Sequence, residues 1–433
     1  MQRAIRRSEL LDIICPIESI DRREHVIIDY RIAPADGVSP DEASALLAVV
    51  TSLGTSEPLD YEDPQRRQDA CAKVISRSSG DQYHYISIAY PLRLCEPHGG
   101  LTQLLSVACF PSEYNFISMM WVEDVHFPDK FMAALAGPRF GINGIREMIS
   151  VHGRPLLGVI IKPRAGAHLS DVAESIYGAL IGGADYAIDD ELITNPEGEF
   201  SFESRVKELV QIIKRASENS GTLKWYVANV TASPFRAAEF AHKARELGAN
   251  AILVNAFIMG LPSVEELARD ASLGLPIITS NMGTAMLARS IASTGMSEML
   301  LAKLSRVAGA DAVYSGILHS SWYSPDLFRN SLGVLRRPMH RLAPSFPVVA
   351  GGLNLLNLWD NIAAQGPDII LQAGSAILGH PKGAQCGAEA FRAVMREVDP
   401  ELSADQVQRK LSALGRQHEG VRLALQALRF SPK

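Results

Sequence analysis

The sequence predicts an α/β protein in which an N-terminal α+β domain with a ferredoxin-like sheet precedes a C-terminal (β/α)8 TIM barrel. The first observation is length, because 433 residues exceed the roughly 250 to 300 at which single hydrophobic cores stop growing. The second is an eightfold alternation of short apolar runs with helix-like stretches after His152. The third is the period-2 apolar pattern that precedes it, which is typical of antiparallel strands.

The N-terminal domain is predicted to span residues 1–137. A helix is expected to begin at Ser39, a favoured N-cap residue type, and to continue through PDEASALLAVV. Strands are expected in three alternating runs: VIIDYRI (26–32), YHYISIAYP (83–91) and NFISMMWVEDVHFP (115–128). These elements indicate an antiparallel sheet covered by helices on one side.

The barrel domain is predicted to span residues 138–433. Its strands are expected at LLGVIIKP (156–163), ADYAIDDE (184–191), KWYVANVT (224–231), AILVNA (251–256), PIITSN (276–281), DAVYSG (311–316), FPVVAGG (346–352) and DIILQAG (368–374). Continuous apolar strands are buried on both faces, as in parallel sheets covered by helices. A doubly wound open sheet is the alternative. A final helical stretch (402–430) should pack outside the barrel.

Composition favours a small-molecule partner. The net charge is only -6 and 47% of residues are hydrophobic, with no basic run, so nucleic acid and membrane surfaces are poor partners. Five scattered cysteines without a CxxC pair argue against a disulfide framework or a zinc site. Without an apolar run of signal-peptide or membrane-helix length, we expect a cytoplasmic protein.

Barrel enzymes carry their chemistry at the carboxyl ends of the strands, so the candidate residues follow directly from the strand assignment. They are Lys162, Arg164, Asp189, Asp190, Glu191, Asn229, Asn255, Thr279, Ser280, Asn281, Tyr314, Ser315, Gly351, Gly352, Gly374 and Ser375. Lys162 should point into the barrel mouth, where it could transfer protons, although a surface lysine at a strand exit is the alternative.

The acidic triplet after the second strand suits a hard cation such as Mg²⁺. An ideal strand would place Asp189 and Glu191 on one side, whereas a bent strand end would present Asp190 with Glu191. Helix capping by one of these acids is an equal alternative.

Two small-residue turns follow the seventh and eighth strands. Gly351 and Gly352 lie in the first turn, and Gly374 and Ser375 lie in the second. Such turns let backbone N–H groups approach a phosphate, although glycines also simply make turns. Among the histidines, which show no metal-binding spacing, His319 after the sixth strand is the best acid-base candidate.

Three ordered motifs, VHGRPLLGVIIKPRAG (151–166), GGADYAIDDE (182–191) and LQAGSAILGHPKG (371–383), resemble the large chain of RuBisCO and its form IV, non-carboxylating relatives, the RuBisCO-like proteins. The resemblance also covers WVEDVHFP and FPVVAGGLNLLNLW. It implies that Lys162 moves protons in enolisation, that Asp190 and Glu191 are two of three Mg²⁺ ligands, and that Gly352, Gly374 and Ser375 bind one phosphate. It further implies a homodimer with shared active sites, in which Thr55 could contact the substrate.

The departures from the family are informative. Ile188 stands where the family has the lysine that becomes a carbamate, so we expect no CO₂ fixation and weak or substrate-dependent Mg²⁺ binding. Thr279 and Ser280 replace a histidine and an arginine, and Tyr314 replaces a histidine. These positions bind a second phosphate in carboxylating members, so the substrate should carry one phosphate. Ile188, Asn229, Asn255 and Ser315 complete the expected pocket.

The remaining chemistry favours a lyase. Loss of CO₂ from a 3-oxo acid gives an enolate without a base, so Lys162, Arg164 and Mg²⁺ would suffice to stabilise and protonate it. Some RuBisCO-like proteins act in this way on 3-oxo-isoapionate 4-phosphate, which makes that sugar acid phosphate a candidate by resemblance. One alternative is a methionine-salvage enolase or isomerase acting on a methylthio-sugar phosphate, with Lys162 or His319 as base. Another is a non-catalytic sugar-phosphate sensor.

Overall fold

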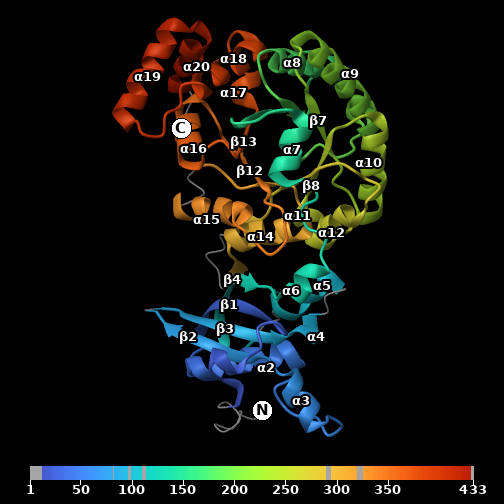
Figure 1. The fold of residues 1–433 in the computed structure, drawn as a ribbon, viewed down its shortest axis with the longest axis vertical. Coiled ribbons are helices and arrows are strands. Elements are labelled where there is room, and N and C mark those ends of the chain that lie inside the picture. The colour runs from blue at the N-terminus through green and yellow to red at the C-terminus, as the bar shows by residue number, and fades with distance from the viewer. Residues whose placement is uncertain are drawn as a thin grey trace. The chain divides into compact units, whose positions relative to one another are not determined.

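The computed structural model describes residues 12–80, 82–95, 99–109, 114–288, 294–318 and 325–430 (Figure 1). The chain divides into two compact units, Met1–Ala136 with Gly283–Ala308, and Gly137–Met282 with Gly309–Lys433. Within the described ranges, no helix combines the length and the apolar character that crossing a bilayer requires.

The first unit is built on a five-stranded sheet in the order β10-β4-β1-β3-β2. Its strands are β1 (His25–Pro34), β2 (Lys73–Ser79), β3 (His84–Pro91), β4 (Ile117–His126) and β10 (Thr294–Met296). The pairs β1/β3, β1/β4 and β2/β3 are antiparallel, whereas β10 is parallel to β4. The predicted strands are confirmed as β1, β3 and β4. Strands β2 and β10 were not predicted, because most of β2 is exposed and β10 has only three residues.

Helix α2 (Pro40–Leu53) packs against the strands of this sheet. It begins as predicted, with the Ser39 hydroxyl accepting a hydrogen bond from the Glu42 backbone N–H at 3.2 Å. The other helical segments of the unit are η1 (Ile17–Ser19), α3 (Pro64–Ala70), α4 (Leu92–Cys95), α5 (Gly100–Leu104), the π-helical turn η3 (Leu105–Cys109), α6 (Asp129–Ala133), α13 (Ala285–Ala288) and α14 (Glu298–Ala308).

A late excursion of the chain, Gly283–Ala308, belongs to the first unit, although the sequence alone divides the chain once, after residue 137. It supplies β10 and α14. The Lys303 ammonium on α14 donates to the Asp124 carboxylate at 2.8 Å and to the Val125 carbonyl at 2.6 Å. These hydrogen bonds hold α14 against β4 of the N-terminal sheet.

The second unit contains a closed barrel of eight parallel strands in the order β11-β12-β13-β5-β6-β7-β8-β9, which confirms the predicted fold. The strands are β5 (Leu156–Ile160), β6 (Tyr186–Ile188), β7 (Trp225–Asn229), β8 (Ala251–Asn255), β9 (Ile277–Ser280), β11 (Ala312–Tyr314), β12 (Phe346–Val349) and β13 (Ile370–Ala373). Each lies inside one of the eight predicted runs.

Helices follow the barrel strands and cover their outer faces (Figure 1). They are α8 (Leu169–Ile181), the short η4 (Gly198–Phe200), α9 (Phe202–Ser220), α10 (Pro234–Leu247), α11 (Ala256–Met259), α12 (Leu261–Arg269), α15 (Pro325–Arg336), α16 (Leu355–Gln365), α17 (Ser375–Leu378) and α18 (Gly383–Met395). The predicted final helical stretch forms α19 (Ala404–Gln417) and α20 (Glu419–Phe430), and α20 packs against α16 and α18.

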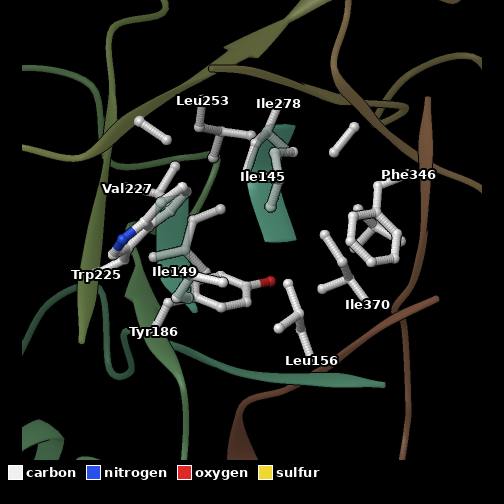
Figure 2. Close-up of a cluster of buried hydrophobic side chains, with 14 of the residues drawn as sticks. Ile145, Ile149, Leu156, Tyr186, Trp225, Val227, Leu253, Ile278, Phe346 and Ile370 are labelled. Atoms are coloured by element: carbon white, nitrogen blue, oxygen red, sulfur yellow. The ribbon is translucent and has the colours of Figure 1, made fainter. Parts of the chain in front are cut away.

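Apolar side chains fill the barrel interior (Figure 2). Ile145 and Ile149 project into it from α7 (Gly141–Ile149), the helix that precedes the first barrel strand. Trp225 and Phe346 pack around them from the strands. Ile188 belongs to the same cluster and its side chain is fully buried, so it is a core residue of the barrel and not the pocket residue that the sequence predicts.

A polar chain of three side chains, the interior hydrogen-bond chain, crosses this apolar core. The Tyr186 hydroxyl donates to the Gln372 side-chain oxygen at 2.6 Å, and the Gln372 side-chain nitrogen donates to the Tyr314 hydroxyl. Gly158 lies between Tyr186 and Gln372 in the strand register. A Cβ atom at Gly158 would lie 2.1 Å from the Tyr186 ring, so only glycine lets the ring pass over β5.

Two buried carboxylates fasten the amino ends of the strands. Asp311 accepts hydrogen bonds from the backbone N–H groups of Phe140 and Gly141 at 2.6 and 2.8 Å, and of Ile277 at 2.9 Å. Asp185 accepts a bidentate pair from Arg154 at 2.8 Å, together with bonds from other groups. Both carboxylates lie at the barrel end opposite to the usual position of the chemistry, so we assign them a stabilising role.

Replacing Asp311 with alanine should lower the free energy of unfolding by about 3 kcal/mol or more, because three backbone donors would lose their acceptor. Asp311→Asn keeps one acceptor oxygen and should cost less. Urea denaturation followed by circular dichroism would measure both, with the exposed Asp326→Ala as the control. Equal midpoints for Asp311→Ala and the control would contradict the assignment.

Replacing Gly158 with alanine should destabilise the barrel by about 1 to 3 kcal/mol, because the new methyl group overlaps the Tyr186 ring. Gly178→Ala on α8 is the matched control, since its Cβ would make only ordinary contacts and alanine favours helices. Thermal unfolding would compare the two variants. In a Gly158→Ala/Tyr186→Ala double variant the total loss should be smaller than the sum of the two single losses, and strict additivity would count against this overlap.

Candidate functional site

A cavity of about 710 Å³ opens at the carboxyl ends of the barrel strands. Polar side chains from several strand ends line it, namely Lys162, Glu191, Asn281, Tyr314, Gln372 and Ser375. Its wall also includes Gly351, Gly352 and Gly374. This is the location that the strand assignment predicts for the chemistry of a barrel.

The Lys162 ammonium forms an ion pair with the Asp190 carboxylate. The Asp190 side chain is only 2% exposed, whereas that of Lys162 is 38% exposed and lines the cavity. The carboxylate therefore fixes the ammonium at the end of β5 while leaving part of it open to a ligand. A lysine held in this way is a hydrogen-bond and proton donor at the cavity wall.

Glu191 also faces the cavity. Burial raises the pKa of its carboxyl, and the neighbouring Asp190 carboxylate acts in the same direction. A hydrogen bond from its own backbone and the positive charges of Lys162 and Arg164 oppose the shift. Glu191 is therefore more easily protonated than an exposed glutamate.

Asp189, unlike its two acidic neighbours, is paired with a buried arginine. Its fully buried carboxylate accepts hydrogen bonds from the Arg205 guanidinium at 3.0 Å, from the Tyr226 hydroxyl at 2.9 Å and from the Asn229 backbone N–H at 2.9 Å. Arg205 is itself fully buried and also donates to backbone carbonyls. Asp189 therefore anchors the strand end, while Glu191 lines the cavity and Asp190 pairs with Lys162 beside it.

The Asn229 side chain supports the same turn. Its amide nitrogen donates to the carbonyls of Asp190, Glu191 and Ile193 at 3.3, 3.1 and 3.0 Å. Its side-chain oxygen accepts from the Thr231 backbone N–H at 3.0 Å. Asn229 is fully buried and does not line the cavity, so it positions the acidic pair through their backbone.

Four further pocket candidates are buried and use their side chains locally. Asn255 caps α11, accepting from backbone N–H groups two and three residues ahead, and its amide nitrogen has no partner among the described residues. The Ser280 hydroxyl accepts from the Met282 backbone N–H at 3.1 Å, and the Ser315 hydroxyl donates to the Val313 carbonyl at 3.0 Å. The Thr279 hydroxyl makes a long bond of 3.5 Å to a β11 carbonyl. None of the four lines the cavity.

The small-residue turns after the seventh and eighth strands both line the cavity. Gly351 and Gly352 are exposed and have positive φ angles of 96° and 90°, which favour glycine. Their backbone N–H groups donate to no acceptor in the described part of the chain. Gly374 precedes the short helix α17, which Ser375 begins. The two turns thus offer backbone donors to an anion.

The remaining candidates lie elsewhere. Arg164 is exposed and outside the cavity lining, although its charge acts on Glu191. Thr55 belongs to the first unit, where its hydroxyl bonds to the Glu57 backbone at 3.2 Å. His319 lies outside the described residues. His380 lines the cavity, but its ring is used structurally, with one nitrogen 2.9 Å from the Gly420 carbonyl.

The sequence reasoning missed Gln372 and Tyr186. Both lie inside strands whose other residues are apolar, and both are buried, at 1% and 3% exposure. A polar residue in the middle of a barrel strand is a usable signal, because it must find a partner inside the barrel. The search of strand ends alone passed over that signal.

The donor set for a cation at this site is small. In the portions of chain that the structure describes, no three His, Cys, Asp or Glu side chains assemble into a metal-binding group. Asp190 and Glu191 are the two available carboxylates, and Lys162 already neutralises the first. Because Mg²⁺ is often held by one or two carboxylates with substrate and water, these residues fit an ion that arrives with substrate better than a resident one.

Comparison with known proteins gives a consistent result. The family model for the ribulose bisphosphate carboxylase large chain, catalytic domain, matches residues 141–426, and the model for its N-terminal domain matches residues 17–131. A ribulose bisphosphate carboxylase-like protein of Archaeoglobus fulgidus is 33% identical over 391 residues, which cover 87% of this chain and 88% of the relative. The ribulose bisphosphate carboxylase of Thermococcus kodakarensis is 30% identical over 419 residues, covering 91% and 93%.

Solved structures agree with the sequence comparison. The octameric ribulose-1,5-bisphosphate carboxylase/oxygenase of Pyrococcus horikoshii, in complex with sulfate, superposes with a TM-score of 0.86 at 27% identity, covering 98% of each chain. The dimeric archaeal Rubisco of Hyperthermus butylicus gives 0.84 at 28% identity, covering 96% of this chain and 98% of the other. The chain therefore belongs to the ribulose bisphosphate carboxylase (RuBisCO) large-chain family of enzymes.

Proposed function

We propose that this enzyme is a non-carboxylating, RuBisCO-like lyase that removes CO₂ from a phosphorylated 3-oxo sugar acid, with 3-oxo-isoapionate 4-phosphate as the candidate substrate. The observation that carries the proposal is the position of Ile188. Its fully buried side chain is part of the apolar barrel interior. By the resemblance described above, the carboxylating members of the family have a carbamylated lysine at this position. The cavity nonetheless keeps Lys162 and Glu191, with Asp190 beside them.

Decarboxylation matches this set of groups because it needs no general base. The bond between the carboxylate carbon and the adjacent carbon breaks, CO₂ leaves, and the electron pair passes to the 3-oxo oxygen to give an enolate. The Lys162 ammonium stabilises that oxygen by hydrogen bonding and then supplies the proton that the carbon takes up. Solvent returns the proton to the lysine. Arg164 lies outside the cavity lining, but its charge acts on Glu191 and would attract the substrate carboxylate.

The substrate should carry one phosphate. Gly351, Gly352 and Gly374 with Ser375 offer backbone donors at one side of the cavity. Thr279 and Ser280, where the resemblance places cationic phosphate ligands, are buried and carry no charge. Each lost charge-assisted contact costs about 1.5 to 3 kcal/mol, so a bisphosphate should bind poorly.

Asp190 and Glu191 are the residues that would hold Mg²⁺ when the substrate is present, and the ion would supply positive charge that stabilises an enolate oxygen. In the absence of substrate the Lys162 ammonium supplies the charge that balances Asp190.

The second candidate is a methionine-salvage type enolase or isomerase. The apolar wall of the cavity favours it, since Ile317, Leu353, Leu355, Phe391 and Leu428 could contact a methylthio group. This reaction begins with proton abstraction, so a base such as Lys162 or His319 would have to act in its neutral form. A sensor without catalysis is less well supported, because the buried Asp190 carboxylate is costly to desolvate without a function.

We also propose a homodimer in which the N-terminal domain of one subunit, including Thr55, completes the site of the other. The dimeric and octameric structural relatives support an assembly of this kind.

Turnover of phosphorylated 3-oxo sugar acids should release CO₂, and Lys162→Met should reduce the rate by about 100-fold or more because it removes the proton donor. NMR in deuterium oxide would follow CO₂ release and deuterium uptake together. Lys207→Met on the exterior helix α9 is the matched control and should retain the wild-type rate. Deuterium uptake without CO₂ from a methylthio-sugar phosphate would transfer the assignment to the isomerase class, and phosphate-ester binding without any turnover would favour the sensor.

Mg²⁺ should raise the melting temperature only when a phosphorylated ligand is present, and EDTA should leave the ligand-free protein unchanged, because two carboxylates hold the ion weakly. Differential scanning fluorimetry with Mg²⁺ and 2-phosphoglycolohydroxamate would measure this. Glu191→Gln should abolish the joint effect, whereas Glu203→Gln, an exposed α9 variant, should preserve it. A lower melting temperature after EDTA alone would indicate a resident ion instead.

A further inference from the structure

The interior hydrogen-bond chain ends at the cavity. Tyr314 and Gln372 line the cavity, and Tyr186 connects them to the barrel core. All three side chains are at most 5% exposed. The direction in which the hydrogens point along this chain decides whether Tyr314 offers the cavity a donor or only an acceptor.

Tyr186 sets that direction. Its hydroxyl lies in the apolar cluster of the barrel interior and has one partner in the described ranges, the Gln372 amide, at 2.6 Å. A buried hydroxyl hydrogen without an acceptor is costly, so Tyr186 must donate and the amide oxygen must face it. The amide nitrogen of Gln372 then necessarily faces Tyr314.

The consequence for Tyr314 is that its oxygen accepts the hydrogen bond from Gln372. Its own hydrogen has no acceptor among the described residues, and the Tyr314 side chain lines the cavity. Burial raises the pKa of the Tyr314 phenol well above its usual value, and the negative charges of Glu191 and Asp190 add to the shift. The phenol therefore stays protonated.

We infer that Tyr314 is a hydrogen-bond donor to the enolate oxygen formed in this cavity, and that Gln372 and Tyr186 are positioning residues that aim its hydrogen there. This role rests on the proposed enolate chemistry. It adds a second hydrogen-bond donor, beside Lys162, to the enolate oxygen. A neutral phenol suits an oxygen that gains charge during the reaction, because the donor is already oriented and needs no reorganisation. Loss of one such donor typically reduces the rate by about 100- to 1000-fold.

The test compares binding of two monophosphates by isothermal titration calorimetry. 2-Phosphoglycolohydroxamate is a planar oxyanion that mimics an enediolate, whereas glycerol 3-phosphate carries the phosphate without that oxyanion. Tyr314→Phe should weaken hydroxamate binding by about 10- to 100-fold and change glycerol 3-phosphate binding by less than about 2-fold. Tyr177→Phe, which removes an exterior hydroxyl on α8, is the control and should change neither.

Tyr186→Phe tests the positioning role, because its hydroxyl does not line the cavity. It frees the Gln372 amide to turn and accept from Tyr314, so hydroxamate binding should weaken by about 3- to 10-fold relative to glycerol 3-phosphate. A purely structural effect would weaken both ligands equally, and that result would overturn the positioning role.

Equal loss of both ligands in Tyr314→Phe, or a wild-type protein that does not prefer the hydroxamate, would overturn the donor role. These readouts do not require turnover. A preserved preference without CO₂ release from any 3-oxo acid would therefore reject the decarboxylase while leaving the Tyr314 donor in place.

Discussion

The candidate site depends on the buried ion pair between Asp189 and Arg205. Both side chains are fully buried, and a charge in that position is tolerated only when it is paired and hydrogen-bonded. The carboxylate gathers the guanidinium, the Tyr226 hydroxyl and the Asn229 backbone at the end of β6. With the strand end fixed in this way, the next two residues turn toward the barrel mouth. The geometry of Asp190 and Glu191 is therefore set by a neighbour that does not line the cavity.

The barrel separates stability from chemistry along its axis. Asp311 and Asp185 satisfy backbone donors and arginines at the amino ends of the strands. Lys162 and Glu191 lie at the opposite ends, in the cavity. Between them the core is apolar except for the interior hydrogen-bond chain. Through its side-chain hydrogen bonds, this chain connects the core to the cavity wall.

The sequence was sufficient for the eight barrel strands because continuous apolar runs of strand length have few alternatives once they repeat with helices between them. It was less informative about the strand ends. Asn229, Asn255 and Ser315 have the right position and polarity for substrate binding, yet their side chains satisfy nearby backbone groups. Strand ends need such internal partners as much as they need ligands, and residue type alone does not separate the two uses.

Strand β10 completes the N-terminal sheet but is synthesised much later than the other four strands of that sheet. Strand β4 is paired on one side by β1, and its other edge is covered by β10, whose residues are translated after five of the barrel strands. On the ribosome, and in any fragment that ends near residue 137, that edge lacks its native neighbour. An uncovered strand edge is a template for pairing with another chain. The N-terminal sheet thus gains its fifth strand only after more than half of the barrel strands have been translated.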